Sequence, residues 1–392
     1  MSTLGIDVLV YAHDGRGLGH VSRSIALCLA IRRLAPQLRV VLVTGSDYVP
    51  ILAGVGHLEW IKLPGYRNVV NNGIADGVSG ASQLSYAEVK SIRISMLRTL
   101  FSELHPKIVV VDHYPGGKEG ELLPILEHHA RRNCSWYLGI RSYPGVGSTI
   151  WNADTSALVN GTYTGVLWYG DSNIACGDTY IDLMKHFSEV RTIETGYVSR
   201  AKELANVCNF STNDSWAGVA AFTWCSNKSD SVIHSLSKVL PTLEREAVPW
   251  RVAIGLGGDS HRHSKAVDAL LGGGLCDISP PDATFLPNLL KCQVAVICGG
   301  YNSLTDIIWS NVPSVVIVRQ TADMEQERHT TSLSVSLSDR ICFMSEEAAC
   351  DPRHLGKAIR QQMLFRQDEA PTIPLNGSET AALALLESLS NS

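Results

Sequence analysis

Residues 294–329 constrain the fold of this chain more than any other stretch. An apolar run rich in valine and isoleucine, residues 294–298, is followed by Gly299 and Gly300. Helical spacing of apolar residues then continues as far as Pro313, which ends a helix because its ring blocks the next turn. The segment therefore predicts a strand, a glycine turn and a helix, the repeating unit of a parallel α/β sheet.

The predicted turn has the chemistry of an anion-binding site. Two glycines let a ligand approach the backbone closely. The first helical turn, from Tyr301 to Ser303, offers unpaired N–H groups and the positive end of the helix dipole. Asn302 and Ser303 add side-chain donors, so the turn is suited to a diphosphate.

Further polar residues follow in an order that suggests one kind of ligand. Asp306 lies one helical turn later, where its carboxylate can accept both hydroxyls of a ribose. Glu325 and Gln326 follow the next predicted strand and are placed for the hydroxyls of a hexose. Diphosphate, ribose and sugar partners thus appear in the order in which a nucleotide sugar presents them.

This segment resembles the donor-binding motif of GT-B glycosyltransferases, both the peptidoglycan N-acetylglucosaminyltransferase type and the plant natural-product type. The plant pattern is His-Cys-Gly-Trp-Asn-Ser-x-x-Glu with a later acid-Gln pair. The matching residues here are Cys298, Gly299, Gly300, Tyr301, Asn302, Ser303, Leu304, Thr305 and Asp306, then Glu325 and Gln326. Cys298 stands where the plant pattern has a phosphate-binding histidine, and Asp306 replaces a glutamate. The alternative is a strand-to-helix turn of a doubly wound domain that binds no ligand.

The N-terminus repeats the strand and glycine-loop pattern. The apolar run at residues 6–13 precedes DGRGLGHVSRS, where Gly17 and Gly19 permit a tight turn and His20 opens an amphipathic helix. The loop is not GxGxxG, and no acidic residue ends the next predicted strand, so a Rossmann NAD site is disfavoured. GLGHVSR also resembles the glycine loop and histidine of GT-B enzymes.

His20 and Asp112 are the predicted catalytic residues. A helix N-terminus disfavours an imidazolium, so His20 should be neutral and able to take a proton. Asp112 ends the sequence Ile-Val-Val-Val-Asp, and the resemblance to the plant enzymes implies that it orients His20. A capping role for His20 and a purely structural Asp112 are the alternatives.

Two arginines are weaker candidates. Arg141, at the carboxyl end of a predicted strand, could meet an acidic acceptor, and a structural ion pair is its alternative. Arg319 follows a predicted strand and could contact phosphate or acceptor, with a solvated loop cation as the alternative. The polar loop at residues 65–85 is expected to shape the acceptor site, as the corresponding region does in GT-B proteins.

Length and composition predict two globular domains. The chain has 392 residues, of which 45% are hydrophobic and 18% charged. The resemblance implies the GT-B fold: two Rossmann-like, doubly wound parallel-sheet domains facing a central cleft, with a C-terminal helix that crosses back. We place an acceptor-binding domain at residues 1–205, a nucleotide-sugar-binding domain at 206–375 and the crossing helix at 376–392. A polar stretch at 199–215 is the expected linker.

Other classes of protein are disfavoured. The net charge of −5 gives no reason to expect nucleic acid as a partner. No apolar run could span a membrane, and no basic region precedes the first apolar stretch, so we expect a cytoplasmic protein. The ten cysteines form no CxxC pair and are expected to be reduced. His261 and His263 lack further ligands nearby, so no metal site is predicted.

The predicted function is inverting, metal-independent glycosyl transfer from a nucleotide-diphosphate sugar to a hydroxyl or amine of a small-molecule acceptor, such as a natural-product intermediate. A UDP-sugar is expected first, with GDP- and dTDP-sugars as alternatives, and no cofactor is required. A nucleotide-sugar hydrolase and a non-catalytic nucleotide-sugar-binding protein stay open, and so does a homodimer. Nucleotide-sugar 2-epimerases share the fold, but no residues of this sequence match the acidic cleft residues that they carry.

Overall fold

The structure is a computed structural model, and it divides into two compact units. Unit 1 comprises Met1–Val207 and Pro374–Ser392, and unit 2 comprises Cys208–Ile373. The residues that it describes are 5–13, 18–66, 68–71, 74–77, 83–129, 134–208, 210, 215–222, 227–243, 249–255, 265–337, 340–365 and 373–391. Gly17 and the pair His261 and His263 lie outside these residues.

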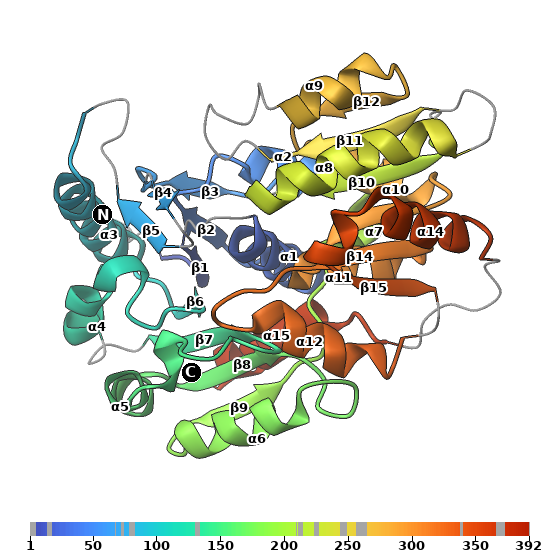
Figure 1. Cartoon of the computed structure of the whole chain (residues 1–392). Helices are drawn as coiled ribbons and strands as arrows, with labels where there is room; N and C mark the ends of the chain where they lie inside the picture. Colours follow the sequence, from blue (N-terminus) through green and yellow to red (C-terminus); the bar gives the residue numbers. More distant parts are fainter. Residues whose placement is uncertain are drawn as a thin grey trace. The chain divides into compact units, whose positions relative to one another are not determined.

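Unit 1 is built on a seven-stranded sheet with the order β3-β2-β1-β6-β7-β8-β9, and all its strands are parallel. Figure 1 shows the run from β6 to β9 side by side. The strands are β1 Val8–Ala12, β2 Val40–Thr44, β3 Trp60–Lys62, β6 Ile108–Asp112, β7 Ser135–Arg141, β8 Gly165–Tyr169 and β9 Arg191–Glu194. The central strands are runs of β-branched and other apolar residues, because helices cover both faces of the sheet.

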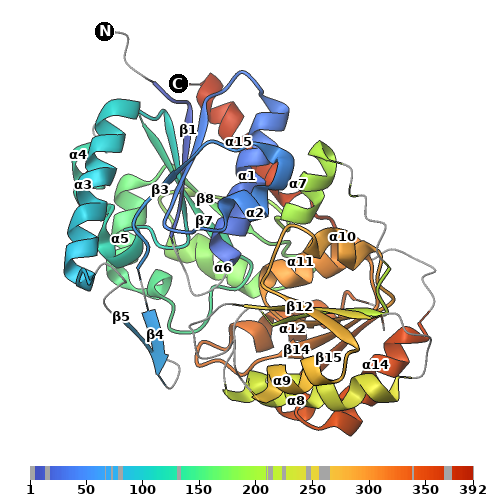
Figure 2. The ribbon, with the colours of Figure 1, turned by 90° about the horizontal axis from the view of Figure 1, so that it is seen from above.

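Helices lie on the two faces of this sheet. In Figure 2, α3 and α4 lie on one side of the strands, and α1 and α15 lie on the other. The helices of unit 1 are α1 Gly19–Leu34, α2 Val49–Ala53, α3 Tyr86–Leu104, α4 Leu123–His129, α5 Ala153–Thr162, α6 Gly177–His186, α7 Arg200–Val207 and α15 Gly377–Ser390, with short 3-10 turns at Gly54–Gly56, Lys118–Gly120 and Thr149–Trp151. A capping box of Ser85 and Glu88 starts α3.

The C-terminal helix α15 returns to unit 1, as predicted. Its first residue, Gly377, packs so closely on the turn at Gly196 that an added Cβ would lie 2.3 Å from the Gly196 carbonyl oxygen. Gly377 N–H donates to the Tyr197 carbonyl at 2.9 Å. Ser378 donates to Glu203 on α7 at 2.7 Å, so buried side chains fix the helix as well as backbone contact.

Two stretches that the sequence predicts as loops contain regular structure. The predicted linker at residues 199–215 includes the boundary between the units, after Val207, but its first part is α7, whose residues Ala201 and Glu203 are fully buried in unit 1. The polar residues of this stretch belong partly to the exposed side of α7, and they do not indicate an irregular segment. The predicted loop at residues 65–85 contains two antiparallel strands, β4 Asn68–Asn71 and β5 Ile74–Gly77.

Unit 2 contains a six-stranded parallel sheet with the order β12-β11-β10-β13-β14-β15. Its strands are β10 Gly218–Phe222, β11 Trp250–Ile254, β12 Cys276–Ser279, β13 Ala295–Cys298, β14 Ser314–Val318 and β15 Ile341–Ser345. Its helices are α8 Asn227–Val239, α9 Lys265–Gly272, α10 Phe285–Leu290, α11 Tyr301–Ser310, α12 Glu325–Ser334, α13 Glu346–Ala349 and α14 Pro352–Met363, with a 3-10 turn at Leu240–Thr242. Figure 2 shows α8, α9 and α14 on one face and α10 and α11 on the other.

The predicted fold class, two parallel-sheet α/β domains, is therefore confirmed. None of the helices within the described ranges combines the length and apolarity that a bilayer crossing requires. The described cysteines are free thiols, in keeping with the scattered pattern in the sequence.

Candidate active site

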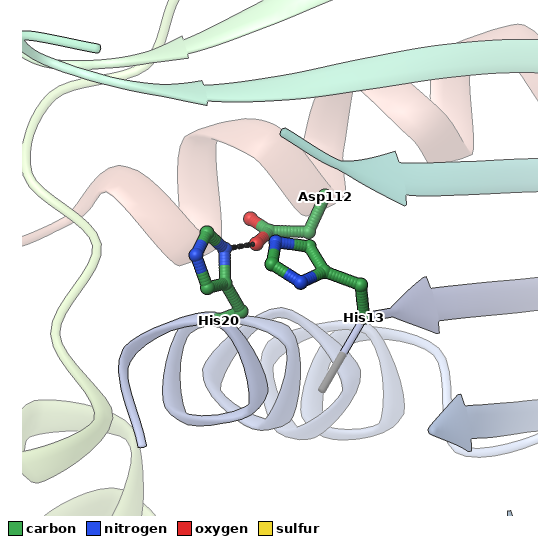
Figure 3. A group of neighbouring side chains, drawn as sticks. All are labelled: His13, His20 and Asp112. Atoms are coloured by element: carbon green, nitrogen blue, oxygen red, sulfur yellow. Dashed lines mark hydrogen bonds and ion pairs between the residues drawn. The ribbon is translucent and has the colours of Figure 1, made fainter. Parts of the chain in front are cut away.

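The topology of unit 1 brings His20 and Asp112 together. β1 and β6 are adjacent in the sheet, and Tyr11 pairs with Val111, so both strands end at the same edge. Asp112 is the last residue of β6, and His20 is the second residue of α1, the helix that follows β1. His20 Nδ1 and Asp112 Oδ2 lie in direct hydrogen-bond contact (Figure 3). The carboxylate is buried, whereas 16% of the His20 side chain is exposed.

This contact determines which nitrogen of His20 can act as a base. A carboxylate oxygen carries no hydrogen when ionised, so it approaches Nδ1 closely only when Nδ1 carries one. The Nδ1–H then donates to Asp112 and leaves the lone pair on Nε2. The pair therefore has the form of an oriented general base.

Arg23 completes the buried ion pair. It lies three residues after His20 on the same face of α1, and its Nη2 donates to Asp112 Oδ2 at 3.1 Å and to Oδ1 at 3.4 Å. The same Nη2 is 3.0 Å from His20 Nδ1. Both groups therefore share one carboxylate, and the Arg23 cation offsets the charge that would otherwise favour a protonated His20.

Two further histidines lie beside this pair. His13, directly after β1, has its ring centroid 3.8 Å from that of His20, and His113, directly after Asp112, has its centroid 5.4 Å from it. Both are at least 95% buried. His113 has φ +70°, and Tyr114 N–H donates back to the Asp112 carbonyl at 2.9 Å, so a tight three-residue turn ends the strand.

The surroundings keep all three imidazoles neutral. Burial lowers the pKa of His20 well below its usual value, and the nearby cations Arg23, Arg141 and Lys118 lower it further. Burial is also the main cause of the lowered pKa of His13 and of His113. Neutral rings are the form in which histidine can accept a proton or a hydrogen bond.

His13, His20 and Asp112 also have ligand atoms within 4.8 Å of one another, a separation compatible with a bound metal ion. The charges nearby oppose this use of the group. Arg23 already donates to the carboxylate, and Lys118 and Arg141 add positive potential at the same rings. A dication would have to displace one cation and approach two others.

The glycine turn of unit 2 leads directly into a helix, as the sequence predicts. Cys298 ends β13, and Gly300 is the N-cap of α11, with no side chain capping its first N–H groups. The two glycines differ. A Cβ on Gly299 would lie 3.3 Å from Val316 and 3.4 Å from Thr330, whereas one on Gly300 would meet nothing within 4 Å. Gly299 thus allows close packing inside the unit, and Gly300 leaves the helix end open to a ligand.

The predicted donor residues of α11 lie around this turn. Asn302 and Ser303 are half-buried in its first turn, while Tyr301 is buried and stacks on His329 with the ring centroids 5.9 Å apart. Asp306 is 7% exposed. Cys298 is 8% exposed, and burial raises the pKa of its thiol, so it stays uncharged beside the helix end.

Arg319 is not a solvated loop cation, because only 6% of it is exposed. Its Nη2 donates to Ser229 at 3.0 Å, and its Nε lies 3.5 Å from a carboxylate oxygen of Glu346. The guanidinium therefore joins β14 to α8 and α13 within unit 2. A contact with phosphate or acceptor stays a prediction, and it would have to share the cation with Glu346.

Glu325 and Gln326 are the first two residues of α12, the helix that follows β14. Gln326 Oε1 accepts from the backbone N–H of Arg319 at 3.2 Å, which fixes the end of β14 against the helix. Both side chains are half-buried, and their roles toward a sugar stay predictions.

The remaining predicted residues lie in unit 1. Gly19 is the first residue of α1, directly before His20. Arg141 is the last residue of β7 and is half-buried, and its charge acts on His20 and His113. A role for Arg141 toward an acceptor stays a prediction.

Three residues of this group, His13, Arg23 and His113, are not among the site residues predicted from the sequence. The signal for the two histidines was present, since each directly follows a buried strand, and adjacent parallel strands end at the same sheet edge. Arg23 could have been found from its spacing, because residues three apart on a helix share a face.

Comparison with known proteins identifies the fold. No protein-family model and no curated protein matches the sequence. Solved structures do match along nearly the whole chain. A putative UDP-N-acetylglucosamine 2-epimerase from Listeria monocytogenes has a TM-score of 0.61 at 12% identity, with 98% of this chain and 96% of that chain covered.

Two further structures extend the likeness. The glycosyltransferase SnogD from Streptomyces nogalater has a TM-score of 0.52 at 16% identity and coverage of 97% of this chain and 99% of that one. UGT89C1 from Arabidopsis thaliana, complexed with UDP-L-rhamnose, has a TM-score of 0.57 at 12% identity and coverage of 99% and 95%. At these identities the likeness establishes the fold alone, and the two parallel-sheet units of this chain form the GT-B fold.

Proposed function

We propose that this protein is an inverting glycosyltransferase that uses a nucleotide-diphosphate sugar, with a UDP-sugar as the first candidate. The observation that carries the proposal is the contact between His20 and Asp112, which leaves the lone pair on Nε2 of a side chain that is 16% exposed. UDP-L-rhamnose in one structural neighbour and the glycosyltransferase among the others support the class of co-substrate and reaction.

The proposed reaction is a single displacement at the anomeric carbon. His20 Nε2 accepts the proton of an acceptor hydroxyl or amine, whose lone pair forms the new bond to that carbon. The bond from the carbon to the diphosphate oxygen breaks on the opposite side, and the diphosphate leaves with the electron pair. Inversion at the anomeric carbon follows.

The N-terminus of α11 is the proposed site for the leaving diphosphate. The open approach at Gly300 and the uncapped N–H groups of the first turn supply donors and a favourable dipole. Asn302 and Ser303 would add side-chain donors, and Asp306 would accept the ribose hydroxyls. Turnover by this mechanism requires no divalent cation and requires the bound donor to reach His20 during the reaction.

One incubation separates the candidate functions. UDP-GlcNAc is supplied with and without a panel of hydroxyl and amine acceptors, and UDP, free sugar, glycosylated acceptor and the C2 epimer are quantified. Acceptor-dependent UDP release with a β-linked product supports transfer. Free sugar without acceptor indicates hydrolysis, and binding without turnover indicates a non-catalytic binding protein.

A second candidate, nucleotide-sugar 2-epimerisation, is favoured by the overall likeness to the Listeria structure. That reaction changes the configuration of the sugar at C2 and leaves the nucleotide sugar as the product. Appearance of the epimer with no net UDP release in the incubation above would establish it.

Replacing His20 tests the proposed base. His20→Ala is expected to lower kcat by roughly 10²- to 10⁴-fold, the usual contribution of a positioned acid or base. Binding of UDP, measured by calorimetry, should change less than about threefold, because Gly300 and Asn302 are proposed to hold the nucleotide. Equal losses of turnover and of nucleotide affinity would remove His20 from the role of base.

A further inference from the structure

The imidazole of His13 differs from that of His113, because both of its ring nitrogens are buried without a partner among the described residues, whereas in His113 only Nδ1 is. His13 directly follows β1, only 3% of it is exposed, and its ring lies against that of His20 (Figure 3). Within the described residues, neither Nδ1 nor Nε2 of His13 has a hydrogen-bond partner. Buried polar side chains in folded proteins are nearly always hydrogen-bonded, so a pair of unsatisfied ring nitrogens calls for an explanation.

The geometry supplies one. A nitrogen of His13, a nitrogen of His20 and a carboxylate oxygen of Asp112 lie within 4.8 Å of one another. A single oxygen or nitrogen atom can bridge such a separation with two hydrogen bonds of about 2.9 Å each. The His13 and His20 rings are tilted by 45° and are not stacked face to face.

We propose that His13 is a second substrate-binding imidazole, which hydrogen-bonds the attacking hydroxyl, amine or water beside His20. The proposal rests on the proposed function, since it assigns His13 to the nucleophile of that reaction. A neutral imidazole can both donate and accept, so His13 orients the nucleophile while His20 takes its proton. The lowered pKa of His13 agrees with this neutral form.

A structural role and a ligand-binding role predict opposite effects on stability. An imidazole without an internal partner costs the folded, unliganded protein stability, because its nitrogens lose water on folding. His13→Leu and His13→Phe remove the nitrogens and keep an apolar side chain of similar size. At least one of the two variants should therefore unfold at the same or a higher urea concentration than the unmodified protein.

The control is His234→Leu, the same replacement on the exposed face of α8 in unit 2. It should leave both stability and turnover unchanged. If both His13 variants unfold more readily than the protein with His13 intact, the ring is satisfied internally and the proposal is overturned.

Turnover gives the second readout, with UDP-GlcNAc as donor and phenol, aniline or water as the nucleophile. His13→Leu and His13→Phe should lower kcat/KM at least about tenfold, the loss expected when one substrate hydrogen bond is removed. His13→Asn, which restores an amide donor and acceptor, should recover part of that loss. Activity within twofold of the unmodified protein in either apolar variant would overturn the proposal.

A measurement on the unmodified protein separates this inference from the proposed function. The ring nitrogens of His13, observed by ¹⁵N NMR in protein labelled at histidine, should shift on addition of UDP-GlcNAc with phenol. A shift without any turnover would retain His13 as a ligand contact and reject the transferase. Turnover without a shift would support the transferase and reject His13 as a ligand contact.

Discussion

Two of the buried polar clusters in the described part of unit 1 differ in how completely their polar groups are hydrogen-bonded. In the first, the Glu121 carboxylate accepts four hydrogen bonds: Arg93 donates at 2.7 and 2.6 Å, Tyr11 at 2.5 Å and Tyr66 at 3.0 Å. Arg93 also donates to the Pro64 carbonyl at 2.6 Å, and its guanidinium lies 4.5 Å from the Tyr66 ring centroid.

The second cluster is the group around His20. Its single carboxylate, Asp112, is shared by His20 and Arg23, while the nitrogens of His13 have no partner within the described residues. Tyr11 of the first cluster and His13 of the second are two residues apart at the end of β1, and both are buried. A difference in burial therefore does not explain the difference in hydrogen bonding.

The comparison teaches how to separate structure from function among buried polar groups. A saturated network stabilises the fold and leaves no donor or acceptor for a ligand. A network with unsatisfied donors or acceptors lowers the stability of the folded protein. Such a network is retained where a ligand supplies the missing hydrogen bonds. The Arg93 network accordingly connects α3 and β1 to the segment before β4 and stabilises the fold. The His20 cluster is the proposed site of chemistry.

The largest expected effect comes from breaking the saturated cluster. Arg93→Met leaves the Glu121 charge buried without its cation, which should lower the free energy of unfolding by about 3–5 kcal/mol. Urea unfolding measures the change. The matched control is Glu379→Gln, in the partly exposed ion pair with Arg33, where a loss of no more than about 1 kcal/mol is expected. Equal losses in the two variants would show that burial and hydrogen-bond saturation do not set how much the Arg93–Glu121 pair stabilises unit 1.

The three histidines of the His20 cluster should make the free energy of unfolding fall at acid pH. The pKa values of His13, His20 and His113 are lowered in the folded protein, so the unfolded chain binds more protons once the pH falls below about 6.5. Stability is therefore fully present above that pH and is lost as the pH falls toward the folded values.

Each histidine should contribute up to about 1.4 kcal/mol per pH unit to this loss. His13→Leu removes one of the three protons and should make the dependence of unfolding free energy on pH shallower. Urea unfolding between roughly pH 6.5 and 5.5 tests it, and an unchanged slope would contradict the neutral, buried state of His13.

The smallest effect is expected from replacing Arg23, whose charge influences the pH dependence of kcat/KM. Arg23→Gln removes a cation that lowers the pKa of His20, so the acid limb of kcat/KM should move to higher pH. Arg23→Lys keeps the charge and should leave the limb where it was. A shift of the same size in both variants would mean that hydrogen-bond geometry, and not charge, sets the protonation of His20.

Much of the fold could be predicted because its signals are local. The strands that end at Asp112 and Arg141, β6 and β7, could be predicted from their apolar runs, since a strand buried on both faces must be apolar throughout. The predicted linker at residues 199–215 includes the unit boundary, but the helix α7 at its start was not predicted, because the burial of α7 depends on α1 and on Ser378 of α15, which lie far away in the sequence.

The candidate site could be predicted only in part. His20 and Asp112 were found because each ends or begins an element recognisable by itself. For Arg319 the sequence left open a phosphate or acceptor contact and a solvated loop cation, and it could not show that Ser229 and Glu346, distant in sequence, contact the guanidinium. No local pattern reports such a partnership.

The sequence by itself determined that strands, glycine turns and helices alternate, which residues stand at the turns, and that His20 opens a helix. Only the tertiary structure decided that β1 and β6 are neighbours, so that four residues from two strand ends and one helix, His13, His20, Asp112 and His113, share one buried edge. The physical reason is that propensity and periodicity act over a few residues, whereas strand order and hydrogen-bond saturation depend on contacts across about a hundred.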